Sequence, residues 1–219
     1  MKLVLKLRES LLANYFVIFT RLLIGFAFIP SGLIKLYGKP FTLLPRTNPV
    51  GYFFDAMYNT GVYWNFLGFC QLLAAFLLMT QKYANIGAGL FLGIIVNIVL
   101  ITYGIGFGNT TIIAFLMLFA VAILLLWDYQ KYALLFEDFT SSKNVIIVND
   151  LISKIWNIYG FLLFVFFVLW CSLPYIIKDF QKFVFFYILV PFIVVSTSLI
   201  YMLYKDFRQF KAKFKNRVN

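Results

Sequence analysis

The chain has 219 residues, of which 63% are hydrophobic and 12% are charged, and its mean hydropathy is +0.91. Soluble domains carry about 25% charged and about 45–50% apolar residues, so this composition excludes a water-soluble fold and places most of the chain in lipid. The absence of histidine excludes imidazole ligation of haem or metal and a histidine general base.

The formal net charge is +11, and the positive charge is concentrated at the C-terminus, where residues 205–219 hold six of the 19 basic residues. Basic residues that follow a membrane span are topology signals and also contact anionic lipid. We therefore expect membrane lipid, and no nucleic acid, as the partner of this segment.

The first 36 residues contain the first predicted span. Residues 1–13 mix basic and apolar side chains, and we expect them to lie along the inner membrane surface. The span covers about residues 14–36. It is not expected to be a cleavable signal peptide, because Arg21 interrupts the apolar run and further spans follow.

A loop with three prolines follows the first span. Within it, Asn48-Pro49 is typical of a helix start, with an N-cap residue followed by proline at the first helical position. The apolar residues after it share one helical face. This pattern predicts a short amphipathic helix over residues 48–59, lying on the outer membrane surface.

Five more spans are predicted from stretches long enough to cross a bilayer. Residues 128–154 form the most polar internal stretch, and we expect 129–154 to be a cytoplasmic connection. We predict that the fifth span ends at Pro174 and that Pro191 kinks the sixth. The spans are expected at 63–79, 84–103, 111–127, 155–173 and 183–204.

The predicted fold is an all-α integral membrane protein. Residues 1–128 would form a four-helix bundle, residues 155–204 two additional transmembrane helices, and residues 205–219 a basic cytoplasmic tail. With the N-terminus inside, the inner segments hold 13 basic residues and the outer loops hold 5. This excess predicts that both termini lie in the cytoplasm.

Polar residues inside a span are costly and need a partner. At 100° per residue, Arg21, Gly32 and Lys35 share one face of the first span. This face either packs against a neighbouring helix or lines a pocket for an acidic or polar group. Arg21 could form an ion pair with Asp128 or contact a ligand, and Lys35 could pair with Asp55 if the loop helix folds back.

The next two spans repeat this pattern. Trp64 and Gln71 share a face of the second span, and Gly93 and Asn97 follow at an interval of four in the third. Amide side chains in the membrane need hydrogen-bond partners inside a bundle. We therefore expect Arg21, Gln71 and Asn97 to face one common interior.

Catalytic groups are sparse in the predicted spans. No span holds two carboxylates, and no serine has an obvious general base. Cys70 and Cys171 are about a hundred positions apart, without a C-x-x-C motif, so thiol–disulfide chemistry of the chain's own is not expected. The sequence therefore favours a binding protein over an enzyme.

Three stretches carry a resemblance to a known family. They are Arg21-x3-Gly25 followed by residues 30–35 (PSGLIK), residues 63–75 (YWNFLGFCQLLAA), and Gly87-Ala88 with Asn97-Ile98 and the apolar run to Asp128. Together they resemble the DoxX-like family of small bacterial inner-membrane proteins, over about residues 14–128. The resemblance does not extend to residues 129–219.

The resemblance implies a four-helix membrane bundle in the bacterial cytoplasmic membrane. Members of the family look like subunits or partners of redox systems, including a quinone-linked thiosulfate oxidoreductase and thiol-handling assemblies. The positions of this chain that match the pattern, and that the resemblance therefore implies as binding residues, are Arg21, Gly32, Lys35, Trp64, Gln71 and Asn97.

Three functions are consistent with the sequence. The first is a non-catalytic accessory subunit that binds a hydrophobic or amphiphilic ligand or a membrane or periplasmic protein partner. The second is a redox component that handles quinone, with Arg21, Gln71 and Asn97 contacting its carbonyl oxygens. The third is a small transporter or lipid-handling protein with an outward cavity beneath the helix at 48–59.

Overall fold

The structure is a computed structural model that describes residues 2–136, 154–177 and 184–218. All regular secondary structure in these ranges is helical. The helices are α1 (Lys2–Arg8), α2 (Leu11–Leu36), α3 (Pro49–Tyr58), α4 (Val62–Met79), α5 (Ala84–Gly104), α6 (Asn109–Trp127), α7 (Tyr129–Phe136), α8 (Ile155–Ile176) and α9 (Val184–Val218).

Six of these helices are long and apolar enough to cross a membrane: α2, α4, α5, α6, α8 and the 186–208 part of α9. The predicted all-α fold with six membrane-length helices is therefore confirmed, and the chain is a multi-pass membrane protein. Helix α3 begins directly after Asn48, whose side chain accepts a hydrogen bond from the Val50 amide at 2.9 Å, as the sequence predicted.

Several predicted helix ends differ from the structure. Helix α8 continues past Pro174 to Ile176, because the Ile177 amide still bonds the Leu173 carbonyl at 3.0 Å. Helix α9 extends to Val218, so most of the predicted tail continues the sixth helix. Within the predicted connection, α7 occupies residues 129–136, and residues 137–153 lie outside the described part of the chain.

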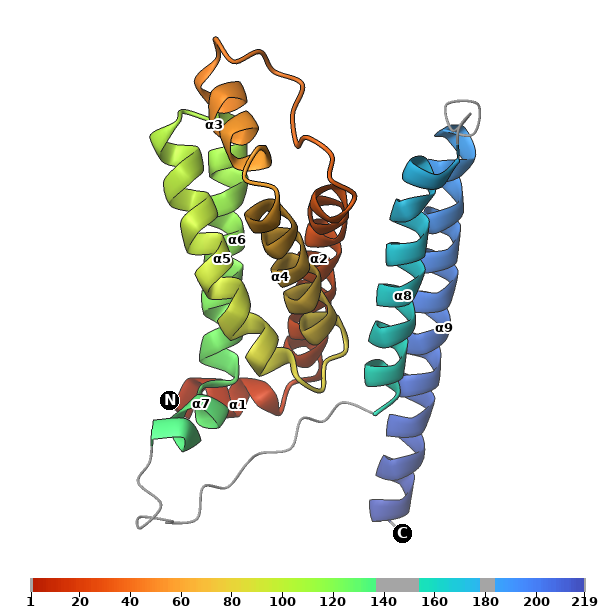
Figure 1. Ribbon diagram of the computed structural model, residues 1–219. Helices are drawn as coiled ribbons and strands as arrows, with labels where there is room; N and C mark the ends of the chain where they lie inside the picture. Colours follow the sequence, from red (N-terminus) through yellow and green to blue (C-terminus); the bar gives the residue numbers. More distant parts are fainter. Residues whose placement is uncertain (1, 137–153, 178–183, 219) are drawn as a thin grey trace.

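Helices α2, α4, α5 and α6 form one bundle, and α8 packs against α2 and α4 on its side (Figure 1). Helix α9 lies along α8 (Figure 1), and its Asp206 accepts a hydrogen bond from the Tyr15 hydroxyl of α2 at 2.7 Å. Helices α1 and α7 lie at one end of the molecule, and α3 lies at the other (Figure 1). These are called the α1 end and the α3 end below.

Two apolar cores hold the helices together. One lies between α2, α4, α5 and α6, where Phe28 and Phe91 meet edge to face with ring centroids 4.3 Å apart. The other joins α2 and α4 to α8 around Trp156, which is fully buried. The additional pair of helices is therefore attached to the four-helix bundle by its own core.

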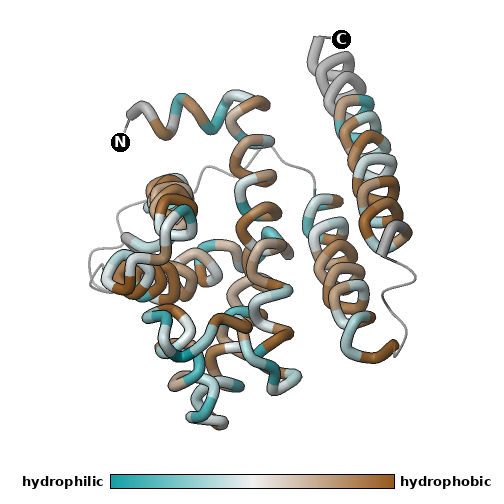
Figure 2. The backbone as a smooth tube through the Cα atoms, turned by 90° about the horizontal axis from the view of Figure 1, so that it is seen from above, coloured by the Kyte–Doolittle hydropathy of each residue, from teal (hydrophilic) through white to brown (hydrophobic). Residues whose placement is uncertain are grey.

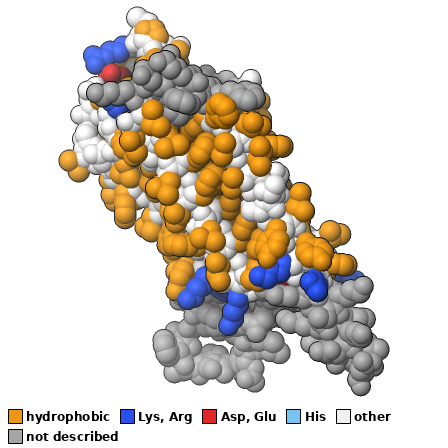
Figure 3. Space-filling view, turned by 90° about the vertical axis from the view of Figure 1, so that its right-hand side faces the viewer, with side chains coloured by type: hydrophobic (Ala, Val, Ile, Leu, Met, Phe, Trp, Pro, Cys, Tyr) orange, Lys and Arg blue, Asp and Glu red, His pale blue; other side chains and the backbone are white. Residues whose placement is uncertain are grey.

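The outer surface of the helices is apolar. Leu116 and Phe119 of α6 are 63% and 67% exposed, as expected for side chains that contact acyl chains. Hydrophobic residues recur along every long helix (Figure 2) and form a broad band on the face shown in Figure 3. On that face, lysine and arginine side chains gather below the band, at the α1 end (Figure 3).

Two glycine contacts allow close approaches between helices. A Cβ atom at Gly68 of α4 would lie 2.7 Å from the Gly32 carbonyl oxygen and 2.8 Å from Lys35 Cβ of α2. A Cβ atom at Gly160 of α8 would overlap the Met79 carbonyl oxygen at the end of α4. Small residues at these points let the helix backbones come together, which drives association in lipid.

Candidate functional site

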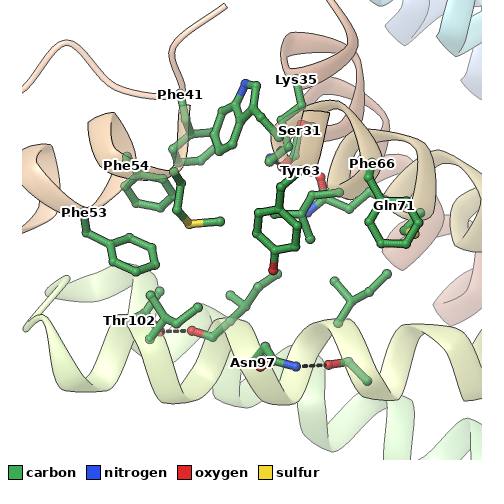
Figure 4. Close-up of a pocket in the computed structure, with 18 of the residues that line it drawn as sticks. Ser31, Lys35, Phe41, Phe53, Phe54, Tyr63, Phe66, Gln71, Asn97 and Thr102 are labelled. Carbon is green, nitrogen blue, oxygen red and sulfur yellow. Dashed lines mark hydrogen bonds between the residues drawn. The ribbon is translucent and has the colours of Figure 1, made fainter. Parts of the chain in front are cut away.

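A cavity of about 500 Å³ lies toward the α3 end, with walls from α2, α3, α4 and α5 and the adjoining loops (Figure 4). Its volume falls within the range of about 300–1,000 Å³ that is typical of small-molecule sites. Its walls are mostly aromatic and aliphatic. The polar or charged residues that line it include Ser31, Lys35, Gln71, Asn97 and Thr102.

Lys35 is the basic residue that lines this cavity, and it is only 5% exposed. Its Nζ donates hydrogen bonds to the backbone oxygen and the hydroxyl oxygen of Ser31, both at 2.9 Å. The Ser31 hydroxyl donates in turn to Gln71 Oε1 at 3.2 Å. A hydrogen-bond chain thus runs from the ammonium group on α2 to the amide group on α4.

Two aromatic rings flank the Lys35 ammonium group. Nζ lies 5.0 Å from the Phe41 ring centroid and 4.9 Å from that of Trp64, within the range of cation–π attraction. The Trp64 indole N–H donates to the Lys39 carbonyl at 3.1 Å, which holds the ring in place. Trp64 therefore forms one wall around the ammonium group and also lines the cavity.

The predicted ion pair between Lys35 and Asp55 is wrong. Asp55 instead pairs with Arg46 at 2.7 Å, with the Arg46 side chain 71% exposed. Asp55 lies on the exposed side of α3, where the loop arginine reaches it, whereas Lys35 is enclosed by aromatic rings. No carboxylate of the described residues lies within 4.0 Å of Lys35 Nζ.

Gly32 has a packing role in this site. It does not line the cavity, and a Cβ atom there would lie 3.0 Å from the Gly68 carbonyl oxygen and 2.8 Å from Leu72 Cγ. The close contact of Gly32 with Gly68 draws α2 against α4. It thereby brings Lys35 and Gln71, one turn away on either helix, into the same hydrogen-bond chain.

The cavity opens sideways between α4 and α5. Phe66 of α4 and Leu90 of α5 both line it and are 57% and 44% exposed. Gly93 also lines it, and a Cβ atom there would meet nothing within 4 Å. Because these helices cross the membrane, this opening faces the acyl chains.

Asn97 lies at this opening and not in the bundle interior, so the prediction of an inward-facing Asn97 is wrong. Asn97 is exposed, and its side-chain amide donates a hydrogen bond to the Gly93 carbonyl one turn earlier, at 2.7 Å (Figure 4). The buried face of α5 instead carries larger apolar side chains, including Phe91 and Ile95. Burial of these side chains against α4 and α6 sets the rotation of α5.

Helix α3 and its loops close the cavity at the α3 end. Phe54 of α3 contacts Phe41 and Phe107, with ring centroids 4.7 and 5.9 Å apart. Phe53 and Phe54 point into the cavity from α3 (Figure 4). The amphipathic helix predicted over residues 48–59 thus covers the site with aromatic rings.

Arg21 belongs to a separate ionic cluster at the α1 end. It bonds the buried Asp128 carboxylate at 2.6 Å, and its other terminal nitrogen donates to Gln81 Oε1 at 3.2 Å. The predicted ion pair of Arg21 with Asp128 is therefore present. Lys131 and Arg8 also approach Asp128, at 2.9 and 3.8 Å.

The expectation of one chamber for Arg21, Gln71 and Asn97 is wrong. Arg21 and Lys35 share a face of α2, but they are fourteen positions apart, which corresponds to about 21 Å along the helix axis. A shared helical face does not imply a shared depth. Arg21 lies at the α1 end, while Gln71 and Asn97 line the cavity toward the α3 end.

Helix α7 is held next to the ionic cluster by Lys131, which pairs with Asp128, and by Tyr132. The Tyr132 hydroxyl donates to the Asn85 carbonyl at the start of α5. Burial, followed by the negative charge of Asp128, raises the pKa of Tyr132 to about 12, with Arg21 acting in the opposite direction. The phenol stays a neutral donor at physiological pH, so the contact between α7 and α5 is maintained.

Both cysteines are free thiols. Cys70 lines the cavity, and Cys171 is buried in α8, so they lie on different helices and form no disulfide. Within the described ranges, no group of three His, Cys, Asp or Glu side chains is placed to hold a metal ion. A second hollow of about 490 Å³, between α2, α8 and α9, is almost wholly apolar.

Ser31 and Phe41 are members of the site that the sequence analysis did not single out. Ser31 precedes Lys35 by four positions on α2, so the i, i+4 spacing could have indicated their contact. Phe41 lies in the loop after α2, and no sequence signal places its ring over Lys35.

Comparison with known proteins shows a partial similarity to an uncharacterized protein. YwoB, an uncharacterized protein of Bacillus subtilis (strain 168), is 42% identical over 77 residues, which are 35% of this chain and 49% of YwoB. The matched part thus spans about half the length of that relative. No protein-family model and no solved structure matches the chain.

Proposed function

We propose that this protein binds an amphiphile in the cavity beneath α3, as a non-catalytic component of the membrane. The observation that carries the proposal is the combination of an apolar cavity, a lateral opening between α4 and α5, and a buried ammonium group on its wall. Apolar walls with a few placed polar groups are the common pattern of ligand sites.

The arrangement matches the two parts of an amphiphile. An acyl or isoprenoid chain would lie along the side chains at the opening, such as Phe66 and Leu90. The polar head would contact Lys35 and Gln71, and α3 would separate it from the aqueous side. Entry through the opening would keep the apolar part of the ligand in lipid throughout.

We place the protein in the bacterial cytoplasmic membrane, with both termini inside and α3 outside. The excess of basic residues in the segments at the α1 end supports this orientation. The DoxX-like pattern over residues 14–128 supports a role as an accessory subunit of a membrane complex. A redox complex is one such assembly. Purification in mild detergent tests that role, because it requires a stoichiometric protein partner.

A quinone is one amphiphile that the cavity could hold. Of its predicted contacts, Gln71 and Asn97 line the cavity, and Arg21 does not. Lys35 would take the place of Arg21 as the donor to a carbonyl oxygen. Lipid analysis of the purified protein distinguishes a quinone from other amphiphiles by mass.

Native mass spectrometry of protein released from lipid nanodiscs tests the binding function. We expect the wild-type protein to retain one amphiphile, and the Gly93→Trp variant to lose it because the indole fills the cavity. Gly89→Trp is the matched control. Gly89 lies one turn earlier on α5, is exposed and does not line the cavity. Equal retention in all three proteins would overturn the proposal.

A further inference from the structure

The wall of the cavity around Lys35 is rich in hydrogen-bond donors. An ammonium group has three N–H donors, and Ser31 accepts two of those of Lys35. Gln71 uses its oxygen to accept from Ser31, and no acceptor for its Nε2 group is found among the described residues. One ammonium N–H and the amide N–H groups therefore remain for a bound molecule.

The same wall carries a charge that the described residues do not compensate. The cavity lining includes Lys35 and no aspartate or glutamate. A buried charge is costly unless it is paired, and the rings of Phe41 and Trp64 offset only part of that cost. A negative charge on the ligand would supply the missing partner.

We infer that the amphiphile carries a singly charged anionic headgroup, a carboxylate or a phosphodiester, bound by Lys35 and Gln71. The inference rests on the proposed function and adds the charge and chemistry of the head. Hydrogen bonds between ionised groups are the stronger ones, so the ammonium would select an anion over a neutral head. One cation in a site removed from water matches one negative charge, and a dianion would leave its second charge unpaired.

Photo-crosslinking in phosphatidylcholine nanodiscs tests this inference on the full-length protein. The probe is a diazirine derivative of hexadecanol, a neutral amphiphile, so we expect it to label the cavity whether or not Lys35 is present. The competitors are palmitate, lysophosphatidylglycerol with the same acyl chain, and unlabelled hexadecanol. Cavity labelling is the part of the signal that Gly93→Trp removes and Gly89→Trp retains.

In the wild-type protein, we expect at least one of the two anions to displace the probe at a concentration about tenfold or more below that of hexadecanol. The stronger anion identifies the headgroup as carboxylate or phosphodiester. Lys35→Met should reduce the preference to within about twofold, and Lys35→Arg should retain it. Lys82→Met is the matched control, because Lys82 is an exposed lysine in the turn between α4 and α5 and should leave the preference unchanged.

Two results would contradict the inference in distinguishable ways. If hexadecanol competes as well as both anions in the wild-type protein, the anionic headgroup is wrong and the cavity still binds amphiphiles. If Gly93→Trp leaves the labelling unchanged, the cavity holds no amphiphile and the proposed function fails as well. The wild-type comparison needs no variant of Lys35, so it remains decisive even if Lys35→Met does not fold.

Discussion

Arg21 and Asp128 are 107 positions apart in the chain, and their side chains form an ion pair of 2.6 Å in which both are almost completely buried. The pair joins the first membrane helix to the end of the fourth. It therefore fixes the relative depth of α2 and α6 at the α1 end. The cavity with Lys35 is about 21 Å further along α2.

Loss of the Asp128 carboxylate should destabilise the protein strongly. Asp128→Asn leaves Arg21 buried without its counterion, and breaking a buried pair in this way costs about 3–5 kcal/mol. The free energy of unfolding in detergent measures the effect. Asp55→Asn removes an exposed ion pair and should cost under about 1 kcal/mol. Similar losses for the two variants would show that the buried cluster contributes little.

A larger residue at Gly160 should detach the additional helices from the bundle. Gly160→Leu would force α8 away from the Met79 carbonyl, and overpacking of this kind costs about 1–3 kcal/mol or more. Gly104→Leu is the control, because a Cβ atom at Gly104 meets nothing within 4 Å. Hydrogen exchange should rise in α8 of the first variant alone.

The same Gly160→Leu variant should still retain its amphiphile, because no residue of α8 or α9 is among the residues that line the cavity. Native mass spectrometry of the variant checks this separation. Loss of the amphiphile together with faster exchange in α8 would contradict it.

The contact between Gly32 and Gly68 should be required for both stability and binding. Gly68→Leu would push α4 away from the Gly32 carbonyl and from Lys35 Cβ. We expect a lower free energy of unfolding, by about 1–3 kcal/mol, and loss of the retained amphiphile. Gly93→Trp should abolish retention without lowering stability, since it fills open space. A Gly68→Leu protein with wild-type retention would exclude a role of this contact in shaping the cavity.

The orientation in the membrane can be measured by cysteine labelling in intact bacterial cells. Cys70 and Cys171 are the only cysteines in the sequence, so replacing both with alanine gives an unreactive background. Arg46→Cys in the α3-end loop should react with an impermeant maleimide added outside. Lys82→Cys should react only after the membrane is permeabilised. The opposite pattern would invert the predicted topology.

Some details of the site followed from local sequence signals. Asn48-Pro49 predicted the start of α3, because capping depends on residues that are close in the chain. The sequence allows two roles for Arg21, and the ion pair with Asp128 is one of them. The structure contains it because a cation within an apolar span needs a partner, and Asp128 follows the last turn of α6 at the same end of the bundle.

Other details could not be read from the sequence. Lys35 and Asp55 have opposite charges, but α3 is oriented by the packing of Phe54 on Phe41 and Phe107, which leaves Asp55 on the exposed side. The interval of four between Gly93 and Asn97 correctly places them on one face of α5. It does not say whether that face is buried.

The sequence by itself determined that the chain crosses a membrane with six helices, because only apolar stretches of about 20 residues can span the hydrocarbon core. It also determined which residues are too polar to lie in lipid without a partner. The tertiary structure alone decided which face of each helix turns inward and which polar groups meet. A membrane helix is apolar on almost every side, so hydropathy gives it no preferred rotation, and the close contacts of small residues and aromatic rings set it instead.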